Sequence, residues 1–170
     1  MAFPAYIAIK GARQGQLKGE TTVVERNDKW MEIFAFTMDV ASPHDPATGH
    51  TSGRRQYKPI TIVKQWGAAS PQILQACATN EVLTEVDIEF TQADTAGMEV
   101  AQTIKLINAT IADIARFTGA PDGAEDTPTA GHSKASDMQE YERVAFTFQK
   151  IEIADVVGGT RFADDWMAQA

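Results

Sequence analysis

The chain has 170 residues, 44% of them hydrophobic and 22% charged, and its formal net charge is −8 at pH 7. This length accommodates one domain with a substantial core, and the composition is that of a globular protein. The acidic balance disfavours nucleic acid as the main partner, because phosphate binding draws on a basic surface. No apolar run is long enough for membrane insertion as a helix, and the single cysteine, Cys77, excludes a disulfide framework.

The N-terminus, "MAFPAYIAIKGAR", has no basic region, and its apolar segment is shorter than that of a signal peptide. We therefore expect the chain to be made and folded in the cytoplasm. Export would then use a route that reads no cleavable leader.

Strand patterns dominate the chain. In chain order, the expected strands are residues 5–11, 30–40, 59–66, 81–90, 98–115 and 143–153, followed by a short strand or tail. Residues 30–40 and 59–66 are apolar on both faces, which indicates burial on two sides or contact with another surface. The apolar phase changes within 98–115 and within 143–153, which indicates bulges that bend these strands, as a closed or half-closed barrel requires.

One helix is predicted, over residues 70–80. Ser70 suits the N-cap, Pro71 suits the first helical position, and Asn80 can end the helix. Ile73, Leu74 and Cys77 form its expected apolar stripe.

Turns and loops separate these elements. Asp94–Gly97 and Val157–Thr160 are expected to be tight turns. Residues 41–55 and 117–138 are long loops rich in Pro, Gly, Ser and Thr, and loops of this length are often functional or mobile. We find no internal repeat and no linker, so residues 1–170 are expected to form a single domain.

The search for catalytic chemistry gives no motif of a nucleotide-binding, serine-hydrolase or zinc-protease site. The three histidines, His44, His50 and His132, all lie in the long loops. His44, Asp45 and His50 could in principle hold a metal, but their loose spacing favours a solvated loop. Cys77 is expected to be a buried, inert thiol. We therefore expect no catalytic residues, no cofactor and no enzymatic activity.

Charged side chains gather at two places. Glu85, Asp87 and Glu89 alternate on one predicted strand, about 6.6–6.8 Å apart on one face, so this acidic face should meet water or a basic partner. Arg54 and Arg55 end the first long loop and open a strand, whereas an anion site would favour a helix N-terminus. The remaining interpretation is that both arginines form salt bridges, either within the fold or to an acidic surface on another chain.

The order and spacing of several segments are characteristic as a set. They are "AFPAYIAIKG" at the N-terminus, a strand at Trp30–Phe36, the loop "TGHTSGRRQYKPITIVK" over Thr48–Lys64, the helix "SPQILQAC", the hairpin and return strand "DTAGMEVAQTIKLINATI", the strand "FTFQKIEI" and the tail "FADDWMAQA". With this set, the chain resembles the haemolysin-coregulated protein (Hcp) family, the tube subunit of the bacterial type VI secretion system.

This resemblance implies a mainly β fold, a small closed or half-closed barrel of two antiparallel sheets with one helix packed on it. It implies hexameric rings that stack into a tube, which a contractile sheath expels from the cell. The rings can hold effector proteins in their channel and are secreted, and the family is related to phage tail-tube proteins. Its partners are other copies, the sheath, spike or tip proteins, and effectors. The chain ends at Ala170, so we expect no C-terminal effector extension.

Assembly gives roles to the unexplained residues. The first long loop is expected to join stacked rings, where weak ion pairs of about 0–1 kcal/mol each are multiplied over six copies. The ring-stacking candidates are Pro43, His44, Asp45, His50, Arg54 and Arg55, and the candidates for contact between subunits are Trp30, Phe34, Trp66, Phe162 and Trp166. Three alternatives remain: a monomeric barrel that binds a small ligand, a phage-tail-tube-like protein, and a hydrolase that uses the loop histidines.

Overall fold

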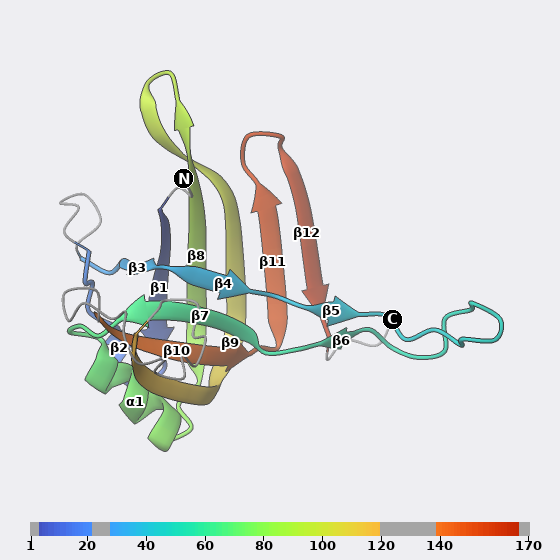
Figure 1. The fold of residues 1–170 in the computed structure, drawn as a ribbon, viewed down its shortest axis with the longest axis horizontal. Coiled ribbons are helices and arrows are strands. Elements are labelled where there is room, and N and C mark those ends of the chain that lie inside the picture. Colours follow the sequence, from blue (N-terminus) through green and yellow to red (C-terminus); the bar gives the residue numbers. More distant parts are fainter. Residues whose placement is uncertain (1–3, 22–27, 120–138, 167–170) are drawn as a thin grey trace, which may run out of the picture.

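Ten strands of the chain form one antiparallel sheet that folds over into two layers, with a single helix beside them (Figure 1). The computed structural model describes residues 4–21, 28–119 and 139–166. Its elements are β1 (Ala5–Gly11), β2 (Gly15–Gln16), β3 (Met31–Ile33), β4 (Ala35–Thr37), β5 (Val40–Ala41), β6 (Gln56–Tyr57), β7 (Ile60–Gln65), α1 (Ser70–Ala78), β8 (Leu83–Asp94), β9 (Gly97–Gly119), β10 (Gln139–Thr147), β11 (Lys150–Asp155) and β12 (Thr160–Asp165). The predicted mainly β fold with two antiparallel sheets and one helix is confirmed.

The segment from β3 to β4 closes the barrel. The strand order β1-β8-β9-β10-β7 leaves β1 and β7 at the two ends, and β3 pairs with β1 while β4 pairs with β7. The chain bends at Phe34, whose N–H donates to the Val63 carbonyl at 2.8 Å. The predicted continuous strand over 30–40 is therefore wrong. Its two apolar faces arise because the segment crosses from one sheet to the other.

Strand β9 runs through both layers and bends as predicted. Its first part pairs with β8 and β11, and its second part pairs with β10. The bend lies at Asn108, which has a φ of 52° and whose carbonyl accepts a hydrogen bond from Gln149. Leu106 and Ala109 are both fully buried on either side of it. These two residues are three positions apart, so in a regular strand they would point to opposite faces. The bulge between them lets both side chains face the core.

The second predicted bend is a break between two strands. The apolar phase changes at Phe148–Gln149 because β10 ends there and β11 begins, and these two strands pair with different parts of β9. The turn Asp94–Gly97 closes the β8–β9 hairpin, and Val157–Thr160 falls in the turn of the β11–β12 hairpin. Residues 117–119 belong to β9, and the rest of the predicted loop, with His132, lies outside the described residues.

Apolar side chains fill the space between the layers. The fully buried members include Ile7, Ile9, Ile62, Ile73, Leu106 and Phe146. They come from both layers and from α1, which packs at the lower end of the barrel in Figure 1. A filled interior gives no support to the alternative of a ligand-binding barrel. Within the described residues, no helix is long and apolar enough to cross a membrane.

Helix α1 differs from its prediction at both ends. It begins at Ser70, but the N-cap is Ala69 and no side chain caps it locally. It ends at Ala78, and Asn80 follows in the left-handed region with a φ of 52°, a common way to end a helix. The buried face consists of Ser70, Ile73 and Ala76, whereas Leu74 is 37% exposed and Cys77 is half-buried.

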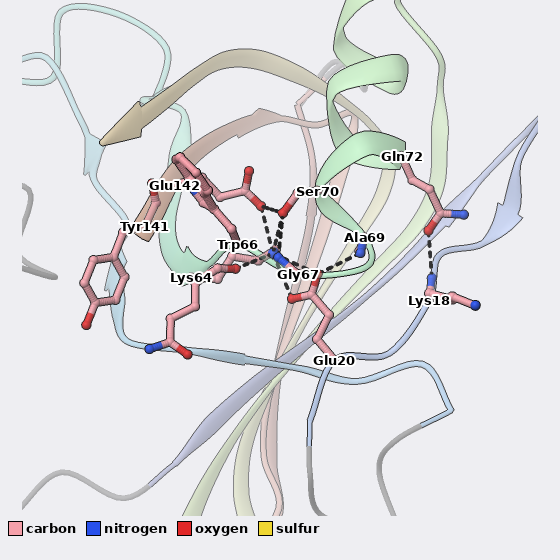
Figure 2. Close-up of polar contacts among 11 residues, drawn as sticks. Lys18, Glu20, Lys64, Trp66, Gly67, Ala69, Ser70, Gln72, Tyr141 and Glu142 are labelled. Atoms are coloured by element: carbon pink, nitrogen blue, oxygen red, sulfur yellow. Dashed lines mark hydrogen bonds and ion pairs between the residues drawn. The ribbon is translucent and has the colours of Figure 1, made fainter. Parts of the chain in front are cut away.

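A buried lysine ties α1 to β7, β10 and the segment after β2 (Figure 2). The Lys64 side chain is fully buried on β7, and its Nζ lies 2.7 Å from Glu142 Oε1 and 2.8 Å from Glu20 Oε2. It also donates to the Gln65 carbonyl at 2.8 Å. The Ser70 hydroxyl donates to Glu142 Oε1, and the Ala69 N–H donates to Glu20 Oε1 at 2.7 Å. A carboxylate thus occupies the helix N-terminus, where negative charge is favoured.

Gly67 makes room for this cluster. A Cβ at position 67 would lie 2.4–2.8 Å from the carboxylate atoms of Glu20. The Gly67 N–H also donates to the Ser70 hydroxyl at 2.9 Å. Ser70 does not act as the N-cap, because its hydroxyl binds Glu142 in the buried cluster.

We predict that Lys64→Met lowers the free energy of unfolding by about 3–5 kcal/mol, because it leaves a fully buried Glu142 carboxylate without its cation. Urea unfolding at fixed subunit concentration, followed by tryptophan fluorescence, measures the change.

Two further variants make this test specific. Lys58→Met, at an exposed lysine of the same segment, should alter stability by less than about 0.5 kcal/mol. Lys64→Met combined with Glu142→Met should recover part of the loss, since no charge is then left unpaired at position 142. A single-variant loss below about 1 kcal/mol would show that the cluster does not hold these elements together.

Candidate functional site

The first long loop is a hydrogen-bonded ribbon. Val40 and Ala41 pair with Tyr57 and Gln56, and the backbone pairing continues outward through Ser52–Pro43 at 2.9 Å and Asp45–His50 at 2.8 Å. Residues 40–57, here called the arm, project from the barrel at the right of Figure 1. Of the predicted stacking residues on it, His44, His50 and Arg54 are exposed, and Pro43 and Asp45 are half-buried.

The two arginines have different environments, which corrects the prediction for Arg55. Its guanidinium pairs with the Asp164 carboxylate on β12 of the same chain, with Nη2 2.6 Å from Oδ1. A further bond goes to the Asp165 carbonyl at 3.2 Å. The Asp164 pairing raises the pKa of Arg55 and, seen from the other side, lowers the pKa of Asp164. Arg55 therefore anchors the arm internally, while Arg54 is exposed to solvent.

Aromatic side chains support the same anchor. The Tyr57 hydroxyl donates to Asp164, and its ring contacts Phe148 and Trp166 edge-on, with centroids 5.2 and 5.8 Å away. The Trp166 Nε1–H donates to the Phe148 carbonyl. Trp166 was predicted to contact another subunit, but here it packs inside its own chain beneath the arm.

The acidic strand face has a basic partner within the chain. Glu85, Asp87 and Glu89 are half-buried on β8, and Lys105 on the neighbouring β9 lies 2.7 Å from Glu85 and 4.0 Å from Asp87. Burial, and then the negative charge of Glu85, raise the pKa of Asp87. The hydrogen bond from Lys105 lowers the pKa of Glu85. Asp87, Glu89 and Lys105 help to line a cleft of about 420 Å³ on this face.

The other predicted contact residues lie at separate places. Phe162 is 52% exposed on β12, beside the acidic cleft that half-buried Trp30 also lines. Phe34 and Trp66 are 44% and 41% exposed and border a second hollow of about 400 Å³. The structure thus brings Trp30 together with Phe162, and Phe34 together with Trp66.

Residues 4–21, 28–119 and 139–166 hold no cluster of three or more His, Cys, Asp or Glu side chains suited to a metal ion. His44 and His50 lie on the arm, where the His44 ring is 2.6 Å from the Ser42 carbonyl. The contacts found at these surfaces are ion pairs, aromatic contacts and strand edges. The ion pairs and aromatic contacts lie within one chain, whereas the exposed apolar side chains and strand edges beside them are features with which proteins bind other proteins.

The family described as "Type VI secretion system effector, Hcp" matches residues 6–154. The "Major exported protein" of Pseudomonas aeruginosa is 31% identical over 175 residues, covering 98% of this chain and 96% of that protein. The chain belongs to the Hcp family. It is a structural subunit of the type VI secretion tube, in a family of secreted proteins, as the sequence resemblance predicts.

Solved Hcp structures share the fold over almost the whole chain. The secreted protein Hcp3 from Pseudomonas aeruginosa is 28% identical, with a TM-score of 0.72 over 97% of this chain and 99% of that one. A crystal structure of an Hcp protein superposes with a TM-score of 0.81 at 23% identity, covering 97% of this chain and all of that one. The second likeness supports the fold alone.

We predict that Asp164→Asn loosens the arm without unfolding the barrel. The substitution removes the carboxylate that holds both Arg55 and Tyr57, so the β5–β6 amides should exchange with deuterium at least several-fold faster. Hydrogen exchange read by mass spectrometry should show no change in β1. Unchanged exchange at Gln56 and Tyr57 would mean that backbone pairing alone fixes the arm.

Neutralising two neighbouring carboxylates should have opposite effects at pH 7. Because the folded-state pKa of Asp87 is raised, its ionised form is penalised in the folded protein above that pKa, and Asp87→Asn should raise the melting temperature. The lowered pKa of Glu85 gives stability above its unfolded pKa, so Glu85→Gln should lower the melting temperature. Each change should be a few degrees at most, since 1 kcal/mol corresponds to about 2–4 °C at this size.

The pH dependence provides the control. Both differences should shrink at about pH 3, where carboxyl groups protonate in the unfolded chain. Melting curves at pH 7 and pH 3 measure both variants, and shifts of the same sign at pH 7 would contradict the assignment.

Proposed function

We propose that this chain forms hexameric rings that stack, through the arm, into the tube that the type VI sheath expels. Family membership supports a tube subunit, and the free edge of β12 is the observation that carries the ring. β12 pairs with β11 along one side, and its other side has no strand partner within the described ranges. An unpaired edge offers backbone N–H and C=O groups to another chain.

The two ends of the larger sheet suit a closed ring. One end is the β12 edge, which carries exposed Phe162, and the other is formed by β2 beside β1. A contact between two different edges is heterologous, and it produces a ring when the rotation closes. Phe162 would then be covered at the seam, and we extend the proposal to Trp30, which lines the same cleft.

The wider partners follow from the family. We propose that the channel of the ring carries effector proteins, and that the assembled tube contacts the sheath and the spike or tip proteins. The tube would assemble in the bacterial cytoplasm and leave the cell without a cleavable signal peptide. The name of the Pseudomonas aeruginosa relative, "Major exported protein", supports export. The net charge of −8 supports partners other than nucleic acid.

We predict that Phe162→Glu dissociates the ring. The substitution places a charge on the exposed apolar side chain at the β12 edge, and it should weaken association at least about tenfold. Native mass spectrometry should give six times the 18.5 kDa subunit mass for the unaltered protein, and mainly single subunits for the variant.

A matched variant on the helix makes the result specific. Leu74 is also an exposed apolar residue, and Leu74→Glu should leave the ring intact. Intact rings with Phe162→Glu would show that the β12 edge is not the seam. An unaltered protein that is a single subunit at tens of micromolar would contradict the ring itself.

A further inference from the structure

A hollow of about 400 Å³ lies at the end of the molecule opposite the arm. It is bordered by Phe34 at the β3–β4 bend and by Trp66 just after β7, with Glu20, Glu32 and Gly67 among its other walls. We call it the aromatic hollow. Strand β7 starts where the arm rejoins the barrel and ends at the hollow, so the two features lie at its opposite ends (Figure 1).

Both aromatic rings of the hollow are held in place by contacts with neighbouring side chains and backbone. The Trp66 Nε1–H donates to the Tyr141 carbonyl at 2.8 Å, and the guanidinium of Arg116 lies 3.9 Å from the centre of the Trp66 ring. Phe34 contacts the Tyr141 ring edge-on at 5.7 Å. Rings fixed in this way lose little conformational entropy when a partner binds, although each is more than 40% exposed.

The charges around the hollow favour a cation. Glu32 is exposed and makes no ion pair within the described residues. Glu20 shares Lys64 with Glu142, so this buried cluster has two carboxylates for one ammonium group. Arg116 offsets part of this negative charge, but it already occupies a face of Trp66. A guanidinium suits aromatic faces combined with carboxylates, because it is planar and always charged.

We propose that the aromatic hollow receives Arg54 from the arm of a second copy, and this rests on the stacking role proposed for the arm. Of the two arginines on the arm, Arg55 is paired with Asp164, whereas Arg54 is exposed with no contact in the described part of the chain. Arg54 lies near the base of the arm, where it can meet the end face of the next copy. Because donor and acceptor lie at opposite ends, each copy can contact the next, which is the heterologous arrangement that extends a stack.

The test exchanges the two charges. Arg54→Glu and Glu32→Arg should each reduce the stacked fraction at least about tenfold while leaving single rings intact, since six copies of the contact are lost together. The double variant with both substitutions should restore stacking to within about twofold of the unaltered protein. Sedimentation velocity and negative-stain microscopy measure both rings and stacks. Gln75→Glu, which adds a negative charge at an exposed position of α1 away from the arm and the proposed seam, should have no effect.

A covalent trap detects the contact even where stacks are short-lived. Arg54→Cys with Glu32→Cys, in a Cys77→Ser background, should be joined by a short bis-maleimide cross-linker into species larger than one ring, since side chains as long as Arg and Glu hold their Cα atoms beyond the reach of a disulfide. Each cysteine variant alone should not. Rings that stack normally with Glu32→Arg, a double charge exchange that does not restore stacking, or a trap with no linked species would each overturn the assignment and leave the ring proposal standing. An unaltered protein that forms no ring would instead overturn the proposed function.

Discussion

The ion pairs of Lys64 are the constraint on which the architecture depends. One buried ammonium group joins β7 to β10 through Glu142 and to the segment after β2 through Glu20, and Glu20 in turn binds the first turn of α1. A buried cation is costly unless it is paired, so an arrangement that separates these elements loses stability. The same arrangement places Trp66 and Gly67 beside Glu20, and it therefore shapes the aromatic hollow.

A second ion pair fixes the direction of the arm. A two-stranded ribbon in water is marginally stable by itself, and the arm has only two residue pairs of regular ladder at its base. Arg55 and Tyr57 both bind Asp164, so the base of the arm is held against β12. The strand edge proposed for the ring seam and the arm proposed for stacking are consequently attached to each other. A ring that closes along β12 orders the anchor of its own arms.

The sequence pattern predicts the regular parts of this structure and misses its long-range partners. Strand β1 has its predicted bounds, and the phase change near Asn108 identifies the bend in β9. The break at Phe34 is missed because a strand that crosses between sheets has the same apolar pattern as one buried on two faces. Lys64 follows Ile60 and Ile62 in the core-facing phase, so its burial was open to prediction. The pairing of Arg55 with Asp164 was not, since 109 residues separate them.

The proposed contact within a ring and the proposed contact between stacked rings differ in how much they depend on charge. Each copy adds a net charge of −8, so the proposed rings should repel one another, and added salt should weaken this long-range repulsion. The proposed seam uses a strand edge and apolar side chains, which salt does not screen. The proposed stacking contact is a single arginine against carboxylates and aromatic rings, and salt weakens its ionic part. The proposed ring closure and the proposed stacking should therefore respond to ionic strength in different ways.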